Sequence, residues 1–243
     1  IYSLEVNIVS ALNLMAKLAC GILKLTLDCS RVTDDEIAEA IMLPVVRVRE
    51  LLRELASENL VNLELENDVL LCYPTSRLKL ALYAIKQGAD VQSVSLGLNW
   101  REFEEICAQA FQFYGYEVYS NFRFTSRKHR YEIDVIGVRA PLIICVDCKR
   151  WSSGRFSALR KSALQHFERV EALSENKSAL YRLGVNGWSK AVLIAAILSI
   201  YEDKVKIYEG IPIVPVFKFN SFLNELPLGL CDLKKIEIKM TSN

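Results

Sequence analysis

Two apolar segments joined by a short turn constrain this chain more than any other feature. Residues 131–137 read Tyr-Glu-Ile-Asp-Val-Ile-Gly and residues 143–151 read Ile-Ile-Cys-Val-Asp-Cys-Lys-Arg-Trp, with Arg139, Ala140 and Pro141 between them. β-Branched and aliphatic residues dominate both segments, and a proline between two such runs is typical of a turn. The sequence therefore predicts two adjacent β-strands at this point of the chain.

The second predicted strand ends in charged residues. Alternate residues of a strand share a face, so Asp147 and Lys149 project together while Val146 and Cys148 point the other way. Burying an ionised carboxylate and an ammonium group is costly unless they are paired or used. Because the intervening turn is short, Asp134 of the preceding strand should lie next to Asp147. We therefore expect two acids and a lysine at one edge of a sheet.

This set of side chains suits a divalent cation and a phosphate. Carboxylate oxygens are the ligands that Mg²⁺ prefers, and Mn²⁺ binds similar sites. We predict that Asp134 and Asp147 bind Mg²⁺ or Mn²⁺, and that Lys149 acts on the attacking water or the scissile phosphate. The alternative interpretation is an exposed strand end whose charges are simply solvated.

The same stretch resembles the PD-(D/E)xK nuclease superfamily, in particular its Mrr-like and archaeal Holliday-junction-resolvase-like branch. The resemblance covers about residues 100–226 and rests on Asp134 within its strand and on Val-Asp-Cys-Lys-Arg-Trp at residues 146–151. Ile133 stands where other branches have proline. The resemblance implies a restriction-endonuclease-like α/β domain of three layers with a central mixed sheet. It also implies metal-dependent hydrolysis of DNA phosphodiester bonds.

Two glutamates compete for a further catalytic role on the helix expected to begin near Trp100. At about 100° per residue, Glu104 lies beside the apolar stripe of this helix, while Glu105 points toward water. The resemblance also places a metal-binding glutamate at the distance that Glu104 has from Gly115. We therefore predict Glu104 as a third metal ligand and catalytic residue. Some members of the family use a glutamine from a later helix, which gives Gln165 as a further candidate.

The chain is expected to contain two domains. Residues 1–92 read as helix, helix, helix and hairpin, the order of a winged helix-turn-helix, with Thr33 predicted to cap a helix. Residues 93–243 form the predicted nuclease domain. Within it we expect a strand at 116–120, a polar loop from Asn121 to Arg130, a helix at 155–173, strands near 190–201, 205–208 and 210–217, and a last helix at 221–226.

The charge is divided unevenly along the chain. Residues 121–161 contain ten basic and three acidic residues, which gives this segment a formal net charge of +7. Residues 1–90 contain nine basic and thirteen acidic residues, which gives a formal net charge of −4. A phosphate polymer binds a basic segment mainly through counterion release, so DNA is the expected partner. The candidate DNA-binding residues are Arg123, Arg127, Lys128, Arg130, Arg150 and Arg155.

Cysteine content and hydropathy bear on the compartment. Seven cysteines in 243 residues, without a secretory signal, indicate a reducing cytoplasm. Cys145 and Cys148 should face opposite sides of a strand, which argues against a zinc site. The apolar run from Ala191 to Ile200 is too short to span a bilayer and predicts a buried strand, so no membrane partner is expected.

The leading hypothesis is a Mg²⁺-dependent endonuclease that cuts DNA, on branched (Holliday-junction-like), modified or ordinary duplex substrates, as a homodimer. The alternative is a winged-helix DNA-binding regulator whose nuclease domain is degenerate and cuts nothing. The complete set of two acids and a lysine, Asp134, Asp147 and Lys149, favours the enzyme. An interaction scaffold would explain the acidic first domain, but neither the motif nor the basic segment.

Overall fold

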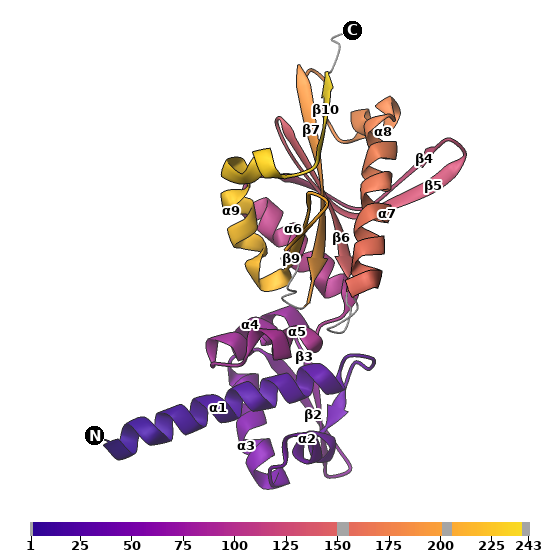
Figure 1. The fold of residues 1–243 in the computed structure, drawn as a ribbon. Helices are drawn as coiled ribbons and strands as arrows, with labels where there is room; N and C mark the ends of the chain where they lie inside the picture. The colour runs from indigo at the N-terminus through magenta and orange to yellow at the C-terminus, as the bar shows by residue number, and fades with distance from the viewer. Residues whose placement is uncertain (1, 150–155, 201–205, 240–243) are drawn as a thin grey trace. The chain divides into compact units, whose positions relative to one another are not determined.

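The structure is a computed structural model that describes residues 2–149, 156–200 and 206–239. It divides into two compact units, residues 1–99 and residues 100–243. Figure 1 shows the helices and strands of both. No helix within the described residues is long and apolar enough to cross a lipid bilayer.

Unit 1 is mostly helical and contains one small sheet. Its elements are α1 (Tyr2–Leu25), β1 (Val32–Thr33), α2 (Asp34–Ile41), α3 (Val45–Ser57), β2 (Val61–Glu66), β3 (Val69–Pro74), α4 (Arg77–Lys86) and α5 (Val91–Leu96). The strands pair antiparallel in the order β1-β3-β2. Thr33 accepts the Glu36 N–H while Glu36 accepts the Thr33 N–H, which is the capping box expected at this helix start.

Helix α5 belongs to unit 1. It packs on α1 and α4, and the Arg77 guanidinium donates to the carbonyls of Leu23 and Gly97, at the ends of α1 and α5. The division therefore lies at residues 99 and 100, whereas the boundary expected from sequence, between residues 92 and 93, falls inside α5.

Unit 2 is an α/β domain built on one mixed sheet. Its described elements are α6 (Trp100–Phe113), β4 (Glu117–Ser126), β5 (His129–Arg139), β6 (Leu142–Lys149), α7 (Phe156–Ser174), α8 (Lys177–Arg182), β7 (Lys190–Ser199), β8 (Ile207–Tyr208), β9 (Ile211–Pro215), the short turn Val216–Lys218, α9 (Phe219–Gly229) and β10 (Lys235–Lys239). The seven strands follow the order β4-β5-β6-β7-β9-β8, with β10 paired to β7. β6–β7 and β7–β9 are parallel and the other pairs are antiparallel.

Helices cover both faces of this sheet, as Figure 1 shows. Helices α6 and α9 lie together on one face, where Phe111 and Phe219 meet edge to face at 5.3 Å between ring centroids. Helices α7 and α8 lie on the other face. The predicted three-layer fold with a central mixed sheet is confirmed.

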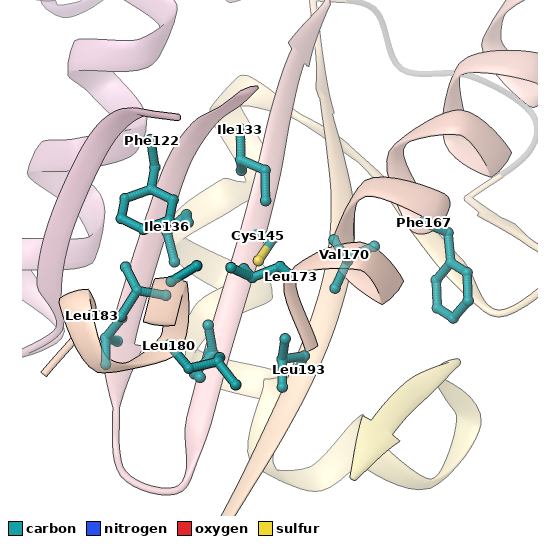
Figure 2. Packing of buried hydrophobic residues seen from close by; sticks show 14 of the residues in the cluster. Phe122, Ile133, Ile136, Cys145, Phe167, Val170, Leu173, Leu180, Leu183 and Leu193 are labelled. Carbon is teal, nitrogen blue, oxygen red and sulfur yellow. The ribbon is translucent and has the colours of Figure 1, made fainter. Parts of the chain in front are cut away.

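The core between the sheet and α7 is apolar and continuous (Figure 2). It brings together side chains of β4–β7, α7 and α8, including Phe122, Ile133, Ile136, Cys145, Phe167, Val170, Leu173, Leu180, Leu183 and Leu193. Ile236 and Ile238, which are half-buried and alternate with exposed residues along β10, pack at the margin of this core. Such burial is the main source of stability for the sheet, and it holds the ends of β5 and β6 in register.

One segment differs from its sequence-based expectation. Residues 121–130, predicted as a polar loop, complete a long β4–β5 hairpin in which Phe122 faces Ile133 and Phe124 faces Tyr131. The aromatic residues alternate with polar ones, so one side of the hairpin joins the core while the other is solvated. The prediction of a loop here was wrong because the polar side chains obscured this alternation.

Gly137 of β5 packs directly against the face of α6. A Cβ atom at this position would lie 2.3 Å from Cδ1 of Phe111, which is fully buried and contacts Tyr116 and Phe219. We expect Gly137→Ala to lower the free energy of unfolding by about 1–3 kcal/mol, because the ring has no room to move. Chemical denaturation measures this. The control is Gly229→Ala, where nothing lies within 4 Å; equal losses in both variants would contradict this packing.

Candidate active site at the ends of β5 and β6

The register of the β5–β6 hairpin places the two predicted acids next to each other. Val135 faces Val146, so Asp134 and Asp147, one residue further along, come opposite each other at the end of the pairing. Residues that face each other across antiparallel strands have neighbouring side chains. The short turn around Pro141 is therefore what brings these carboxyl groups together, as expected from the sequence.

Asp147 is almost completely buried and makes two ion pairs. Its side chain is 1% exposed, and its carboxylate lies 3.0 Å from Nζ of Lys149 and 3.0 Å from Nη1 of Arg169. The Ser162 hydroxyl lies 3.5 Å from Oδ2. The prediction that Asp147 and Lys149 share a face is confirmed. The two cations offset the cost of burying this charge.

Asp134 is held in a different way. Its Oδ2 accepts a hydrogen bond of 2.7 Å from the backbone N–H of Cys148. Burial raises the pKa of Asp134, and the nearby charge of Asp147 raises it further. The Cys148 N–H, Lys149 and Arg169 act in the opposite direction. The charges of Asp147, Lys149 and Arg169 thus influence the ionisation of Asp134, which makes no ion pair of its own among the described residues.

The third candidate acid, Glu104, comes from α6. Its side chain is only 8% exposed, whereas Glu105 is exposed and accepts a hydrogen bond from Gln109. The predicted orientation of the helix is confirmed. Burial and the charge on Asp134 raise the pKa of Glu104 to about 7, although a hydrogen bond from Asn121 lowers it. Asp134 is therefore close enough for its charge to disfavour ionisation of Glu104.

Helix α7 supplies residues that sequence reasoning missed. Ser162, His166 and Arg169 share one helical face, toward β6, and His166 is fully buried with Nε2 2.8 Å from the Cys145 carbonyl. Burial lowers the pKa of His166, so the neutral ring donates this bond. Gln165, the candidate from the resemblance, is exposed instead. The spacing of residues 162, 166 and 169 was visible in the sequence, but not which strand it would meet.

Comparison with known proteins identifies this domain. Residues 96–182 match the family model Mrr_cat, described as restriction endonuclease. This segment of the chain resembles a restriction-endonuclease domain of the PD-(D/E)xK nuclease superfamily. The match includes α6, β4, β5, β6, α7 and α8, and with them every candidate site residue named above.

Other similarities are more distant. An uncharacterised protein of Archaeoglobus fulgidus is 28% identical over 139 residues, which is 56% of this chain and 97% of that protein. A crystal structure of a protein of unknown function, AF1548, matches 50% of this chain at 16% identity with a TM-score of 0.29. Protein VC1899 from Vibrio cholerae matches 93% at 12% identity with a TM-score of 0.31. The chain spans about half the length of these two structures.

The acids of unit 2 have the chemistry that a hard divalent cation prefers. Glu104, Asp134 and Asp147 offer oxygen ligands, and the unfavourable proximity of their charges would be relieved by a cation. No three His, Cys, Asp or Glu side chains in the described part of the chain already surround one point. Asp147 is engaged by Lys149 and Arg169, so a bound cation would compete with these ion pairs.

Four of the basic candidates in unit 2, Arg123, Arg127, Lys128 and Arg130, lie on the β4–β5 hairpin. Arg127 and Lys128 form its two-residue turn, with φ values of 49° and 68°. Both angles are unusual for residues other than glycine or asparagine, and the turn places two cations at the tip. Arg127 pairs with Glu175 at 2.7 Å. Arg150 and Arg155 lie outside the described residues.

Proposed function

We propose that this chain is a metal-dependent endonuclease that hydrolyses phosphodiester bonds of DNA. The observation that supports the proposal is the proximity of Asp134 to Asp147 at one end of β5 and β6, with Lys149 3.0 Å from Asp147 and Glu104 near Asp134, in a segment that matches the restriction-endonuclease model. Acidic side chains that can bind a metal ion, together with an adjacent lysine, are the groups that this chemistry requires. A cleavage assay with and without Mg²⁺ tests it.

Each residue has a proposed role. Glu104, Asp134 and Asp147 would hold Mg²⁺ or Mn²⁺, which when bound supplies positive charge that polarises the scissile phosphate and favours deprotonation of the attacking water. Lys149 is oriented by Asp147 at 3.0 Å, so its ammonium group can donate to the phosphate or to the water. Arg169 steadies Asp147 from α7 and thereby sets the direction of Lys149.

The two glutamates of α6 provide a matched test. We expect Glu104→Gln to lower kcat/KM by about 10- to 100-fold, as for residues that support a metal site, and Glu105→Gln to change it little. Because the pKa of Glu104 is about 7, its charged form dominates only above neutrality, so Mg²⁺ affinity should rise from pH 6 to pH 8 and Glu104→Gln should flatten this rise. Titration calorimetry measures the affinity. Equal effects of both substitutions would contradict the assignment.

The resemblance to archaeal Holliday-junction resolvases makes branched DNA the first substrate to test, followed by modified and ordinary duplexes. A homodimer is the proposed assembly, since two strands must be cut. In unit 1, the β1-β3-β2 sheet and the order of its helices support the winged-helix interpretation, which stays a prediction.

We propose that unit 1 mediates self-association or restrains the nuclease domain rather than reading DNA. In a winged helix the third helix usually enters the major groove. Here Arg47 of α3 pairs with Glu50 at 2.6 Å, and Arg49 binds the buried Asp34 and the carbonyl of Asp68. These bases are already engaged within unit 1, so they offer little to a phosphate.

A fragment of residues 100–243 should therefore retain most of the DNA affinity of the whole chain. Its slope of log affinity against log salt should change by less than about 0.9, the value for one phosphate contact, since the basic hairpin is intact. Fluorescence anisotropy with a labelled duplex measures both. Tight, strongly salt-dependent binding by residues 1–99 alone would show instead that unit 1 is a targeting module.

A further inference from the structure

A hollow of about 580 Å³ lies on the β4–β5 hairpin, where three arginines meet. It is lined by Arg123, Phe124, Thr125, Arg130, Tyr131, Glu132 and Arg182. Six of these residues come from the two strands, while Arg182 comes from the end of α8, about fifty residues further along the chain. Three cations and one anion give the hollow a net positive charge.

The walls of the hollow are fixed by contacts within the domain. Nη1 of Arg182 donates to the Arg123 carbonyl at 2.9 Å, and its guanidinium lies 4.6 Å from the ring centroid of Phe122. Phe124 and Tyr131 stack with their ring centroids 5.3 Å apart. Arg182 is thus held in place before any ligand arrives, and its remaining donors are available for an anion because a guanidinium carries five N–H groups.

We propose that this hollow binds the phosphodiester backbone of the DNA substrate, at a distance from the acids. Guanidinium groups match phosphate oxygens in geometry and charge, and contacts of this kind position DNA without reading its sequence. This inference rests on the proposed function, and it adds Arg182 and a defined location to it. The aromatic wall belongs to the core and serves to hold the strands that carry the arginines.

The positions of Arg130 and Asp134 on β5 give the separation between the hollow and the acids. Arg130 precedes Asp134 by four residues on β5. At about 3.3 Å per residue this is roughly 13 Å along the strand, or about four base pairs of duplex at 3.4 Å each. The hollow would therefore contact the DNA backbone away from the scissile phosphate.

Glu132 acts against this binding. It lies directly opposite Arg123 in the strand register, and its carboxylate accepts a hydrogen bond of 2.8 Å from Nε of Arg123. A carboxylate in the hollow both repels phosphate and competes for this arginine. Removing its charge should strengthen DNA binding, the opposite of removing an arginine. A merely structural role of these residues predicts no such change of sign.

The experiment measures binding of the full chain to a 30-base-pair labelled duplex, in EDTA, by fluorescence anisotropy between about 50 and 200 mM KCl. We expect Arg130→Gln and Arg182→Met each to weaken binding about three- to tenfold and to reduce the salt slope by about 0.9. Glu132→Gln should tighten binding. The control is Lys190→Gln, which removes the same charge from the exposed first residue of β7, outside the lining of the hollow, and should leave binding unchanged.

The outcomes separate this inference from the proposed function. If Arg130→Gln and Arg182→Met bind like Lys190→Gln while the unaltered chain binds DNA, the hollow is not the site, although the nuclease proposal stands. If DNA binding follows the predictions but no cleavage occurs, the hollow is supported and the nuclease proposal fails. Tighter binding of a matched RNA duplex, or competition by free phosphate at low millimolar levels, would overturn the assignment to DNA. Arg130→Gln keeps the test valid if Arg182→Met unfolds.

Discussion

Asp134→Asn, Asp147→Asn and Lys149→Met should each reduce the rate of DNA cleavage by about a thousandfold or more. Such a loss corresponds to about 4 kcal/mol of transition-state stabilisation. The physical reason is that the two acids carry the charge that would hold the metal, and that Lys149 is the ammonium group fixed beside them at 3.0 Å from Asp147. Asparagine at position 134 can still accept the Cys148 N–H, so the fold should survive.

DNA affinity separates this prediction from simple unfolding. Without metal, the Asn variants should bind DNA as tightly as the unaltered chain or more tightly, because a negative charge near the phosphates has been removed. Single-turnover cleavage and anisotropy on the same preparations provide the comparison. Unchanged cleavage by any one of the three variants would contradict its assignment, whereas loss of both cleavage and binding would indicate a folding defect.

The largest expected effect on stability concerns Asp34 in unit 1. Its side chain is fully buried, and its carboxylate accepts hydrogen bonds from Arg49 Nε and from the backbone N–H of Leu70 at 3.2 Å. It thereby joins α2, α3 and β3. We expect Asp34→Ala to lower the free energy of unfolding by about 3 kcal/mol, because the Leu70 N–H loses its acceptor and Arg49 its counter-charge.

Asp35 is the matched control for this prediction. It is the next residue, it also lies in the first turn of α2, and it is exposed. Asp35→Ala should lower the free energy of unfolding by about 0.5 kcal/mol, the usual effect of removing an acid from a helix N-terminus. Urea denaturation monitored by circular dichroism measures both variants. If the two lose the same stability, the linking role of Asp34 is wrong, and Arg49 would be free for another function.

Local periodicity was enough to predict the central part of the site. The alternation along residues 143–149 placed Asp147 and Lys149 on one face, and the period of α6 separated Glu104 from Glu105, as burial confirms. Both inferences need only neighbours within one element. The short turn at Pro141 supplied the one long-range relation, the pairing of β5 with β6.

The missed residues come from elements that only the tertiary fold brings together. Arg169 reaches Asp147 across 22 positions of the chain, and Arg182 reaches the Arg123 carbonyl across 59. No local pattern encodes which face of a strand a later helix covers. The β4–β5 hairpin was missed for another reason: Arg127 and Lys128 occupy turn positions where Asn-Gly is the usual signal.

The most direct test of the central claim is cleavage of supercoiled plasmid, synthetic four-way junctions and modified duplexes by the full chain, with Mg²⁺ and with EDTA. We expect that at least one of these DNAs is cut with Mg²⁺, that none is cut in EDTA, and that Asp134→Asn cuts none. Binding to DNA without cleavage of any substrate in Mg²⁺ or Mn²⁺ would contradict it, and would favour a DNA-binding regulator with an inactive nuclease domain.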